Sequence, residues 1–399
     1  MEETDEPGAG GLRTTLRGRV VTLTEAGELA DGVVSFDGPL LDFVGPAAEF
    51  DGELPTLAGE PPIVLPGLID VHCHGGGGFG FPETDFDGIV SAVGFHRGRG
   101  TTTLVASLVS ATEDELLERI DLLGKAVDAG LLAGIHLEGP FISEHRCGAH
   151  DPARIVPGDP AMLRRLLRHG DGRIVSVTVA PETARFDELA DLLNEAGVLL
   201  SLGHTVADYE RSVRAMRRGE RVSITHLFNA MPALAHRDAN FLTAAMAAAG
   251  RGDVVAELIA DGVHLADGTV RMVFDTLGAD NLALITDAMA AAGMPDGRYH
   301  LGILDVIVAD GVSRLYDPHG PGTIAGGTAC ASDVLRRTVF HAGVDLTSAA
   351  TAACATPARL LGIDDRVGVL RAGMRADVLV TDSQLTPVTV YKDGLPWNS

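Results

Sequence analysis

Histidine and acidic residues stand at the ends of several apolar segments of this sequence. They are His72, His74, Glu138, His204, His226 and Asp287. Imidazole nitrogens and carboxylate oxygens are donors that zinc and iron accept, and a catalytic centre keeps an open position for water beside about three protein ligands. If the fold brings these residues together, the sequence predicts a divalent metal site, most simply for zinc or iron.

The segment His72-Cys73-His74 has a spacing that suits two ligands. Residues i and i+2 of a strand point to the same side, so both imidazoles would face inward while Cys73 points away as a packed thiol. The same parity turns His136 inward, two residues before Glu138. We interpret His136 as a structural histidine whose ring nitrogens are satisfied by neighbours.

Asp287 is the acidic residue at the end of the last apolar segment. A metal ion lowers the pKa of a bound water to about 7, and a nearby carboxylate can accept the proton and later return it to a leaving group. Asp287 is therefore a candidate general base and acid for hydrolysis of an amide or another C–N bond. The alternative is a capping aspartate at a strand–helix junction.

The elements that must position these residues form a repeating pattern. Apolar runs alternate with amphipathic stretches such as 113–129 and 160–169, which is typical of parallel strands connected by helices. The eight runs are 63–74, 102–109, 132–141, 174–181, 198–204, 222–231, 254–264 and 282–289. Eight repeats favour an α/β fold of the (β/α)8 TIM-barrel type over a doubly wound sheet, and the carboxyl ends of barrel strands meet at one mouth.

Both ends of the chain differ from this middle part. Short alternating apolar segments broken by glycine, proline and aspartate predict small antiparallel strands before residue 59 and after residue 368. Strands at both termini would leave open edges unless they pair with each other. We therefore expect a small discontinuous β-sandwich domain formed by residues 1–64 and 365–399, around a barrel formed by residues 65–364.

Composition excludes several classes of partner. The 399 residues include 31 Lys and Arg against 55 Asp and Glu, a net charge of −24, which disfavours binding to nucleic acid. No apolar run approaches the roughly 20 residues of a membrane span, and the acidic start Met1–Glu6 is unlike a signal peptide. We expect a cytoplasmic protein without a membrane partner, whose four scattered cysteines are reduced thiols.

The glycine-rich segment 75–80 contains a formal GxGxxG, but the Pro82 and acidic residues that follow do not open an apolar helix. It is also similar to the oxyanion loop of lipases, although the sequence has no G-x-S-x-G nucleophile motif. We interpret it as a flexible loop at the barrel mouth. No phosphate-binding P-loop is present, since Gly124-Lys125 is followed by Ala126.

Together these motifs resemble the amidohydrolase superfamily and, within it, the N-acetylglucosamine-6-phosphate deacetylase family. The similar segments extend over nearly the whole chain: 66–75 (PGLIDVHCHG), 136–141 (HLEGPF), 146–150 (RCGAH), 203–205 (GHT), 225–231 (THLFNAM), 259–264 (IADGVH) and 286–288 (TDA). The resemblance implies hydrolysis of N-acetyl-D-glucosamine 6-phosphate to D-glucosamine 6-phosphate and acetate. It implies Glu138, His204 and His226 as ligands of the principal metal, with His72 and His74 available for a second ion near Glu138 and Asp287.

The same resemblance implies roles for residues outside the metal site. His150 would help to polarise the substrate carbonyl, and a homodimer is implied in which Arg237 reaches the neighbouring subunit's site. Residues implied to contact the amino-sugar phosphate are Ala149, His150, Asn229, Ala230, Arg237, Asp261, His264, Ile324, Ala325 and Gly326. Substrate contact by Cys147 is left open.

Two alternatives remain at this point. Another C–N hydrolase of the superfamily, such as a dihydroorotase-like, deaminase-like or amino-acid deacylase enzyme, would share the metal residues but not the phosphate-binding group. A barrel without activity would be a scaffold, although here every candidate ligand position is filled. Binding of a sugar phosphate separates the first alternative from the resemblance.

Overall fold

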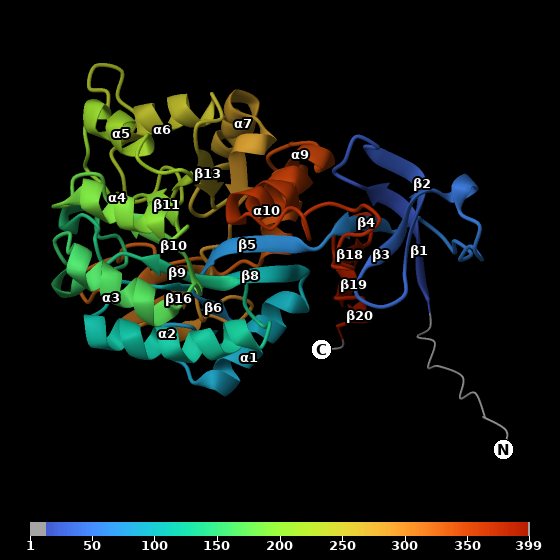
Figure 1. Cartoon of the computed structure of the whole chain (residues 1–399), viewed down its shortest axis with the longest axis horizontal. Helices are drawn as coiled ribbons and strands as arrows, with labels where there is room; N and C mark the ends of the chain where they lie inside the picture. The colour runs from blue at the N-terminus through green and yellow to red at the C-terminus, as the bar shows by residue number, and fades with distance from the viewer. Residues whose placement is uncertain (1–12, 398–399) are drawn as a thin grey trace.

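The computed structural model describes residues 13–397, and its largest element is a parallel barrel (Figure 1). Eight strands follow one another in chain order around it. They are β5 (Leu68–Cys73), β8 (Thr101–Leu108), β9 (Gly134–Glu138), β10 (Ile174–Val179), β11 (Leu199–Leu202), β12 (Val222–Ile224), β13 (Val255–Leu258) and β14 (Leu282–Leu284). Seven of them lie within the predicted apolar runs and β8 begins one residue before its run, so the predicted (β/α)8 barrel is confirmed.

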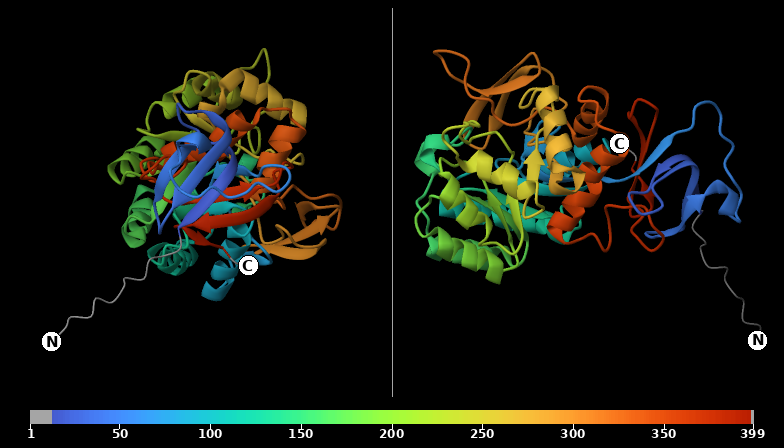
Figure 2. Two further views of the ribbon diagram at one scale, coloured as in Figure 1. Left: turned by 90° about the vertical axis from the view of Figure 1, so that its right-hand side faces the viewer. Right: turned by 90° about the horizontal axis from the view of Figure 1, so that it is seen from above.

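Helices cover the outside of the barrel (Figures 1 and 2). They are α1 (Phe86–Arg97), α2 (Glu113–Asp128), α3 (Pro160–Gly170), α4 (Phe186–Glu195), α5 (Tyr209–Met216), α6 (Phe241–Ala249), α7 (Asp267–Leu277), α8 (Ala331–Phe340), α9 (Leu346–Ala350) and α10 (Thr356–Leu361). The helix α2 begins with a capping box, in which Thr112 and Glu115 exchange side-chain-to-backbone hydrogen bonds. The two helices predicted at 113–129 and 160–169 agree with α2 and α3 to within one residue at each end.

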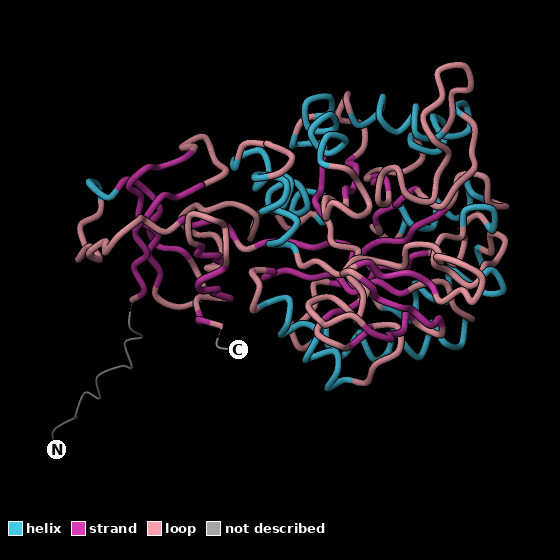
Figure 3. Tube along the Cα trace, turned by 180° about the vertical axis from the view of Figure 1, so that it is seen from behind, coloured by secondary structure: helices cyan, strands magenta, loops and turns pink. Residues whose placement is uncertain are grey.

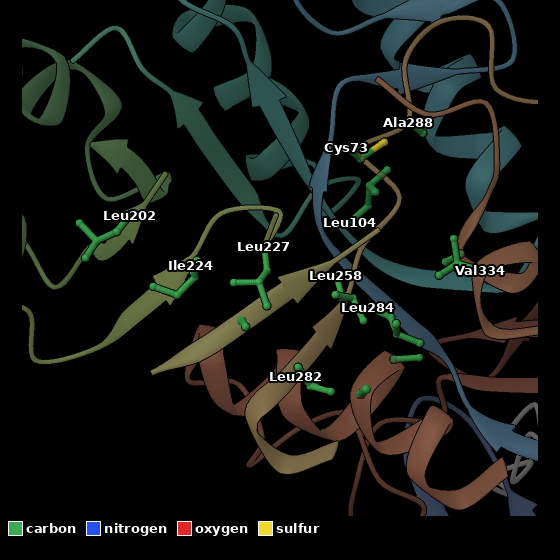
Figure 4. Close-up of a cluster of buried hydrophobic side chains, with 14 of the residues drawn as sticks. Cys73, Leu104, Leu202, Ile224, Leu227, Leu258, Leu282, Leu284, Ala288 and Val334 are labelled. Carbon is green, nitrogen blue, oxygen red and sulfur yellow. The ribbon is translucent and has the colours of Figure 1, made fainter. Parts of the chain in front are cut away.

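The core between the strands and helices is almost entirely aliphatic. Figure 4 shows leucines of successive strands, among them Leu202, Leu258 and Leu284, beside Ile224 and Val334. Each of these five side chains is at most 4% exposed. Burying such a side chain contributes about 1.5–3 kcal/mol to folding. The packing of these side chains therefore stabilises the strands whose ends form the barrel mouth.

The barrel closes between its first and last strands through side chains as well as backbone. Asp70 on β5 accepts a hydrogen bond from Thr286 Oγ1 at 2.6 Å, just beyond the end of β14. The backbone completes the junction, because the amide of Asp287 donates to the carbonyl of His72 and the amide of His74 donates to that of Ala288. This junction therefore fixes the first metal-ligand motif beside Asp287.

Strands from both ends of the chain form a second, seven-stranded sheet, in the order β20-β19-β18-β4-β1-β2-β3 (Figure 2). Its members are β1 (Thr14–Val21), β2 (Glu28–Phe36), β3 (Leu41–Pro46), β4 (Ile63–Pro66), β18 (Val378–Thr381), β19 (Pro387–Lys392) and β20 (Leu395–Pro396). A separate apolar cluster, which includes Val34, Phe36 and Val378, belongs to this sandwich domain. The sequence correctly predicted that the two termini share one domain; segment Met1–Glu6 lies outside the described residues.

The connection between the two domains differs in one detail from the expectation. β4 pairs with β1 and β18 and so belongs to the small sheet, whereas β5 begins the barrel at Leu68. Gly67 lies between them, where a Cβ atom would approach the side chain of Thr102 to 2.2 Å. We therefore propose a boundary at Gly67 rather than between residues 64 and 65. The mouth of the barrel lies at the opposite end of β5, away from the small domain.

Two small sheets were not predicted. The segment expected as a flexible loop forms a two-stranded ladder, β6 (Gly75–Gly76) with β7 (Phe79–Gly80), and the amides of Gly77 and Gly78 donate to backbone carbonyls of residues 292 and 290. A three-stranded antiparallel sheet follows β14, formed by β15 (Gly297–Leu301), β16 (Leu304–Ala309) and β17 (Val312–Leu315). Figure 2 shows the three-stranded sheet, in orange, beside the barrel, and Figure 3 shows the strands of the described residues in magenta.

Candidate active site

All six candidate metal ligands lie at the carboxyl ends of barrel strands and form two groups. The first is Glu138, His204 and His226, and the second is His72, His74 and Asp287; within each group the ligand atoms lie within 4.8 Å of one another. All six side chains are nearly buried. Residues separated by more than 200 positions in the sequence therefore meet because parallel strands place their ends at one mouth.

The first group is a compact triangle of electron-pair donors. Glu138 Oε1 lies 2.8 Å from His204 Nε2 and 2.9 Å from His226 Nε2, and the two nitrogens are 3.0 Å apart. His204 Nδ1 donates its proton to the carbonyl oxygen of Arg146 at 2.8 Å, so its Nε2 presents a lone pair. Such closely spaced donors repel one another unless a cation lies between them, and ligand bonds of about 2.0–2.2 Å suit this spacing.

The second group is built around the first strand motif. His74 Nε2 lies 3.2 Å from His72 Nε2 and 3.2 Å from Asp287 Oδ1. Glu138 also reaches this group, because its Oε2 is 3.2 Å from His74 Nε2 and 3.7 Å from His72 Nε2. The carboxylate of Glu138 therefore faces one group with each of its oxygens.

Charge at the two groups favours a cation. Burial alone would lower the pKa of His74, but Asp287 and Glu138 raise it to about 9, and Glu138 and Asp287 likewise raise the pKa of His72 well above its ordinary value. Burial opposes ionisation of Asp287, yet the charges of His72 and His74 hold the pKa of its carboxyl far below the ordinary value. The donor types, their spacing and the concentrated negative charge all fit a divalent metal ion.

Three of these residues have strained backbones. His204, His226 and Asp287 have φ angles of 45°, 29° and 48°, in the left-handed region that side chains other than glycine rarely adopt. Each lies two or three residues beyond the end of its strand. Such strain costs about 1–3 kcal/mol per residue and persists where the surroundings over-determine the conformation, as in functional sites.

A cavity that is partly open to solvent lies above the two groups. Most of the predicted substrate-contacting residues line it, together with Gly148, Val109, Leu301 and Thr323. The predicted residues that it brings together are Ala149, His150, Asn229, Ala230, His264, Ile324 and Gly326. Small-molecule sites are usually concave surfaces of this kind, in which a few polar groups converge among apolar ones.

His150 is held in one tautomer. The backbone N–H of Ser110 donates to its Nδ1 at 3.0 Å, and the Ser110 hydroxyl lies 2.9 Å from the same nitrogen. An accepting Nδ1 leaves the proton on Nε2, which lies 3.2 Å from Glu138 Oε2 at the floor of the cavity. Burial lowers the pKa of His150, so the ring is a neutral N–H donor.

Three predicted substrate contacts lie elsewhere in this chain. Ala325 is fully buried in an apolar cluster, since its extended segment alternates and only its neighbours Ile324 and Gly326 face the cavity. Asp261 does not line the cavity; its Oδ2 accepts from His264 Nδ1 at 2.8 Å and orients that ring. Arg237 is exposed on the segment between Met231 and Asn240 and is not part of the cavity wall.

Sequence reasoning missed the polar residues behind the ligands. Glu257 on β13 is 3% exposed and lies 3.1 Å from His72 Nδ1 through its Oε2. Asp70 accepts a hydrogen bond from Thr286, the residue before Asp287, and Ser110 donates to His150. The signal for the two acids was available, because each interrupts an apolar run that was itself recognised as a strand. The thiol of Cys73 and the ring of His136 are buried, as expected, and His136 bonds Ser107 and Thr178.

Comparison with known proteins gives consistent results. A model of the amidohydrolase family matches residues 63–395. N-acetylglucosamine-6-phosphate deacetylase of Bacillus subtilis is 34% identical over 80% of this chain and 81% of its own length, and the Homo sapiens protein of the same name is 33% identical over 84% of each chain. A solved variant of this deacetylase from Mycobacterium smegmatis, in complex with N-acetyl-D-glucosamine 6-phosphate, has a TM-score of 0.90 and 39% identity over 98% of this chain and 100% of that one.

Proposed function

The chain belongs to the amidohydrolase family, and we propose that it hydrolyses N-acetyl-D-glucosamine 6-phosphate to D-glucosamine 6-phosphate and acetate. The observation that carries the proposal is the bridging position of Glu138 between two metal-ligand groups, with Asp287 and the N–H of His150 beside them. The substrate is that bound by the similar deacetylase of Mycobacterium smegmatis, and seven of the ten residues expected to contact it line the cavity above the ligands. No helix among residues 13–397 is long and apolar enough to cross a membrane.

The ligand groups would hold one or two divalent ions, zinc or iron, with Glu138, His204 and His226 for one ion and His72, His74 and Asp287 for the other. Such an ion lowers the pKa of water to about 7 and polarises a carbonyl oxygen. Asp287 is ionised and accepts the proton of the attacking water, whose oxygen forms a bond to the acetyl carbon. As the C–N bond breaks, Asp287 returns the proton to the amine nitrogen.

His150 stabilises the oxygen of the acetyl group as negative charge develops there. Its Nε2 proton points to the cavity floor, and its tautomer is fixed by Ser110 before substrate arrives. A donor that is already in place costs no reorganisation during the reaction, which is why such groups have large effects on rate. Ala149 lies beside it in the cavity wall and would contact the acetamide methyl group.

Replacing His150 with alanine should lower kcat by about 10²–10³-fold, the usual loss for one oxyanion donor. The variant Ser110→Ala is a matched control: it removes the hydroxyl but keeps the backbone N–H that fixes the tautomer, so its kcat should change little. Steady-state kinetics of acetate release measures both. Equal losses in the two variants would contradict this role for His150.

The phosphate group poses an electrostatic problem, because no lysine or arginine of the described residues lines the cavity. Although burial alone would lower the pKa of His264, Asp261 raises it and favours a cationic ring there. Asn229 and the backbone at Ala230 can donate hydrogen bonds. We propose that Arg237, which is exposed on the segment between Met231 and Asn240, supplies the missing cation to the cavity of a second copy in a homodimer.

Arg237→Ala should raise KM for the phosphorylated substrate without a comparable change in metal content. Arg237→Ala and Asp287→Asn chains can be unfolded, mixed in equal amounts and refolded together. At substrate concentrations well below the KM of Arg237→Ala, the mixture should show about a quarter of the native activity, since half of the dimers then contain one complete site of the two. The mixture is compared with each variant refolded alone. No recovery in a mixture shown to contain heterodimers would exclude a contribution across subunits.

A direct test of the reaction is product identification. Acetate and D-glucosamine 6-phosphate should appear in equal amounts from the phosphorylated acetamide, as measured by proton nuclear magnetic resonance. Dihydroorotate and N-acetylated amino acids, offered in parallel, represent the sister reactions of the family. Turnover of one of these, without turnover of the sugar phosphate, would replace the proposed substrate.

The four cysteines are free thiols, consistent with the cytoplasmic location that we propose.

A further inference from the structure

A belt of hydrogen-bonded side chains runs inside the barrel beneath the two ligand groups. It takes polar residues from strands β8 to β13, none of them more than 3% exposed. Its members are Ser107, His136, Thr178, Ser201, Ser223, Thr225 and Glu257. Polar groups buried this deeply destabilise the folded state unless each of them has a hydrogen-bond partner. We therefore ask what a continuous belt of such groups contributes to the site above it.

The belt begins and ends at the first ligand motif. The N–H of Cys73 donates to Ser107 Oγ at 3.1 Å, and Ser107 contacts His136 Nδ1 at 2.9 Å. His136 Nε2 then contacts Thr178 Oγ1 at 2.9 Å, and hydroxyl contacts of 2.6–3.0 Å lead through Thr225 to Ser201 and Ser223. The first residue of this path is therefore the one between His72 and His74.

Glu257 terminates the belt and faces both ligand groups. Its Oε1 accepts from Ser223 Oγ at 3.2 Å. Its Oε2 lies 3.1 Å from His72 Nδ1 and 3.3 Å from the backbone nitrogen of His226. Because an ionised carboxylate only accepts, His72 Nδ1 must carry the proton and donate it, which leaves the lone pair of His72 on Nε2, the atom that faces His74 and Asp287.

We propose that Glu257 is a positioning residue that makes His72 a metal ligand, and that this contact enables the chain to hold a second divalent ion. The inference rests on the metal-dependent hydrolysis proposed above. Carboxylates that accept the remote N–H of a ligating histidine fix both its tautomer and its ring orientation, and their loss typically reduces metal affinity 10–100-fold. Without an acceptor at Nδ1, the carboxylates of Glu138 and Asp287, which lie 3.7 and 3.5 Å from Nε2, would draw the proton to the ligand atom itself.

The test is metal stoichiometry and affinity of the full chain, measured by titrating metal-free protein with Zn²⁺ and by elemental analysis after dialysis. The native chain should bind two ions. Glu257→Leu, which offers His72 Nδ1 no acceptor, should bind the second ion at least 10–100-fold more weakly. Glu257→Gln, whose amide oxygen can still accept from Nδ1, should lose less affinity for that ion and should leave the affinity of the Glu138, His204 and His226 group unchanged. The variant His72→Asn, which lacks the ligand itself, should match Glu257→Leu.

Ser223→Ala is the matched control, because it removes a donor to the other oxygen of the same carboxylate and leaves the contact with His72 in place. It should bind two ions as the native chain does. If Glu257→Leu does not fold, Glu257→Ala, which also lacks the acceptor, decides the question. Native affinity for the second ion in the variant without an acceptor, or a single ion in the native chain, would overturn the proposal. Neither result depends on substrate, so failure here is distinct from failure of the proposed reaction.

Discussion

Replacing Asp287 with asparagine should lower kcat for acetate release by about 10⁴-fold, the upper end of what general acid and base catalysis supplies. The large effect follows from two proton transfers by one carboxylate, first from water and then to the leaving amine. Asparagine has the same shape but cannot accept the first proton. KM should change much less, because the residues proposed to contact the sugar and its phosphate are others.

The metal content of the Asp287→Asn variant shows whether the substitution removed only the general base or also disrupted the metal site. The Glu138, His204 and His226 group contains no atom of Asp287, so the Asp287→Asn variant should retain at least one ion per chain. Asp280→Asn, at a carboxyl whose side chain is 80% exposed, serves as the matched control and should keep native activity. An Asp287→Asn enzyme with more than about a tenth of native kcat would remove Asp287 from the role of general base.

The second large effect concerns Glu138. Replacing it with glutamine should abolish turnover and weaken binding of both ions, because Oε1 contacts the first histidine pair and Oε2 contacts His74 and His150. The substitution removes a negative charge from a place where four buried imidazoles converge, and a single amide cannot present an acceptor oxygen to both sides. Affinity for the first ion should fall by at least the 10–100-fold seen for weaker, indirect contacts.

Zn²⁺ titration of metal-free Glu138→Gln and of the native chain measures this prediction directly. Glu144→Gln, six residues away with a side chain 72% exposed, is the control for a loss of charge in the same loop region. It should bind metal as the native chain does. Native stoichiometry and affinity in Glu138→Gln would contradict the bridging role of this carboxylate.

The positions of the metal ligands could be predicted from the sequence because the apolar pattern indicates where strands end. Each ligand lies at or near the end of a barrel strand, and these ends meet at the barrel mouth whatever their separation along the chain. His72 and His74 also share a face by strand parity, as the structure confirms. Parity gave the correct surroundings of His136 for the same reason.

Other features were not predictable because they depend on contacts between distant segments. The sheet of β15 to β17 consists of short strands with exposed, mixed residues, which carry little periodic signal. Asp261 and Ala325 lie in motifs next to true cavity residues, and only the fold shows that Asp261 turns to His264 and Ala325 to the core. Glu257 could have been noticed as an acid within an apolar strand, but its partner His72 lies 185 residues away.

The central claim is that this site releases acetate from N-acetyl-D-glucosamine 6-phosphate through bound metal. The most direct measurement is the rate of acetate release from this compound and from unphosphorylated N-acetyl-D-glucosamine, with metal content determined on the same sample. The account predicts metal-dependent turnover that strongly favours the phosphorylated sugar and is lost on chelation. A metal-loaded enzyme that releases no acetate from either sugar would contradict it and assign the site to another amide or cyclic imide.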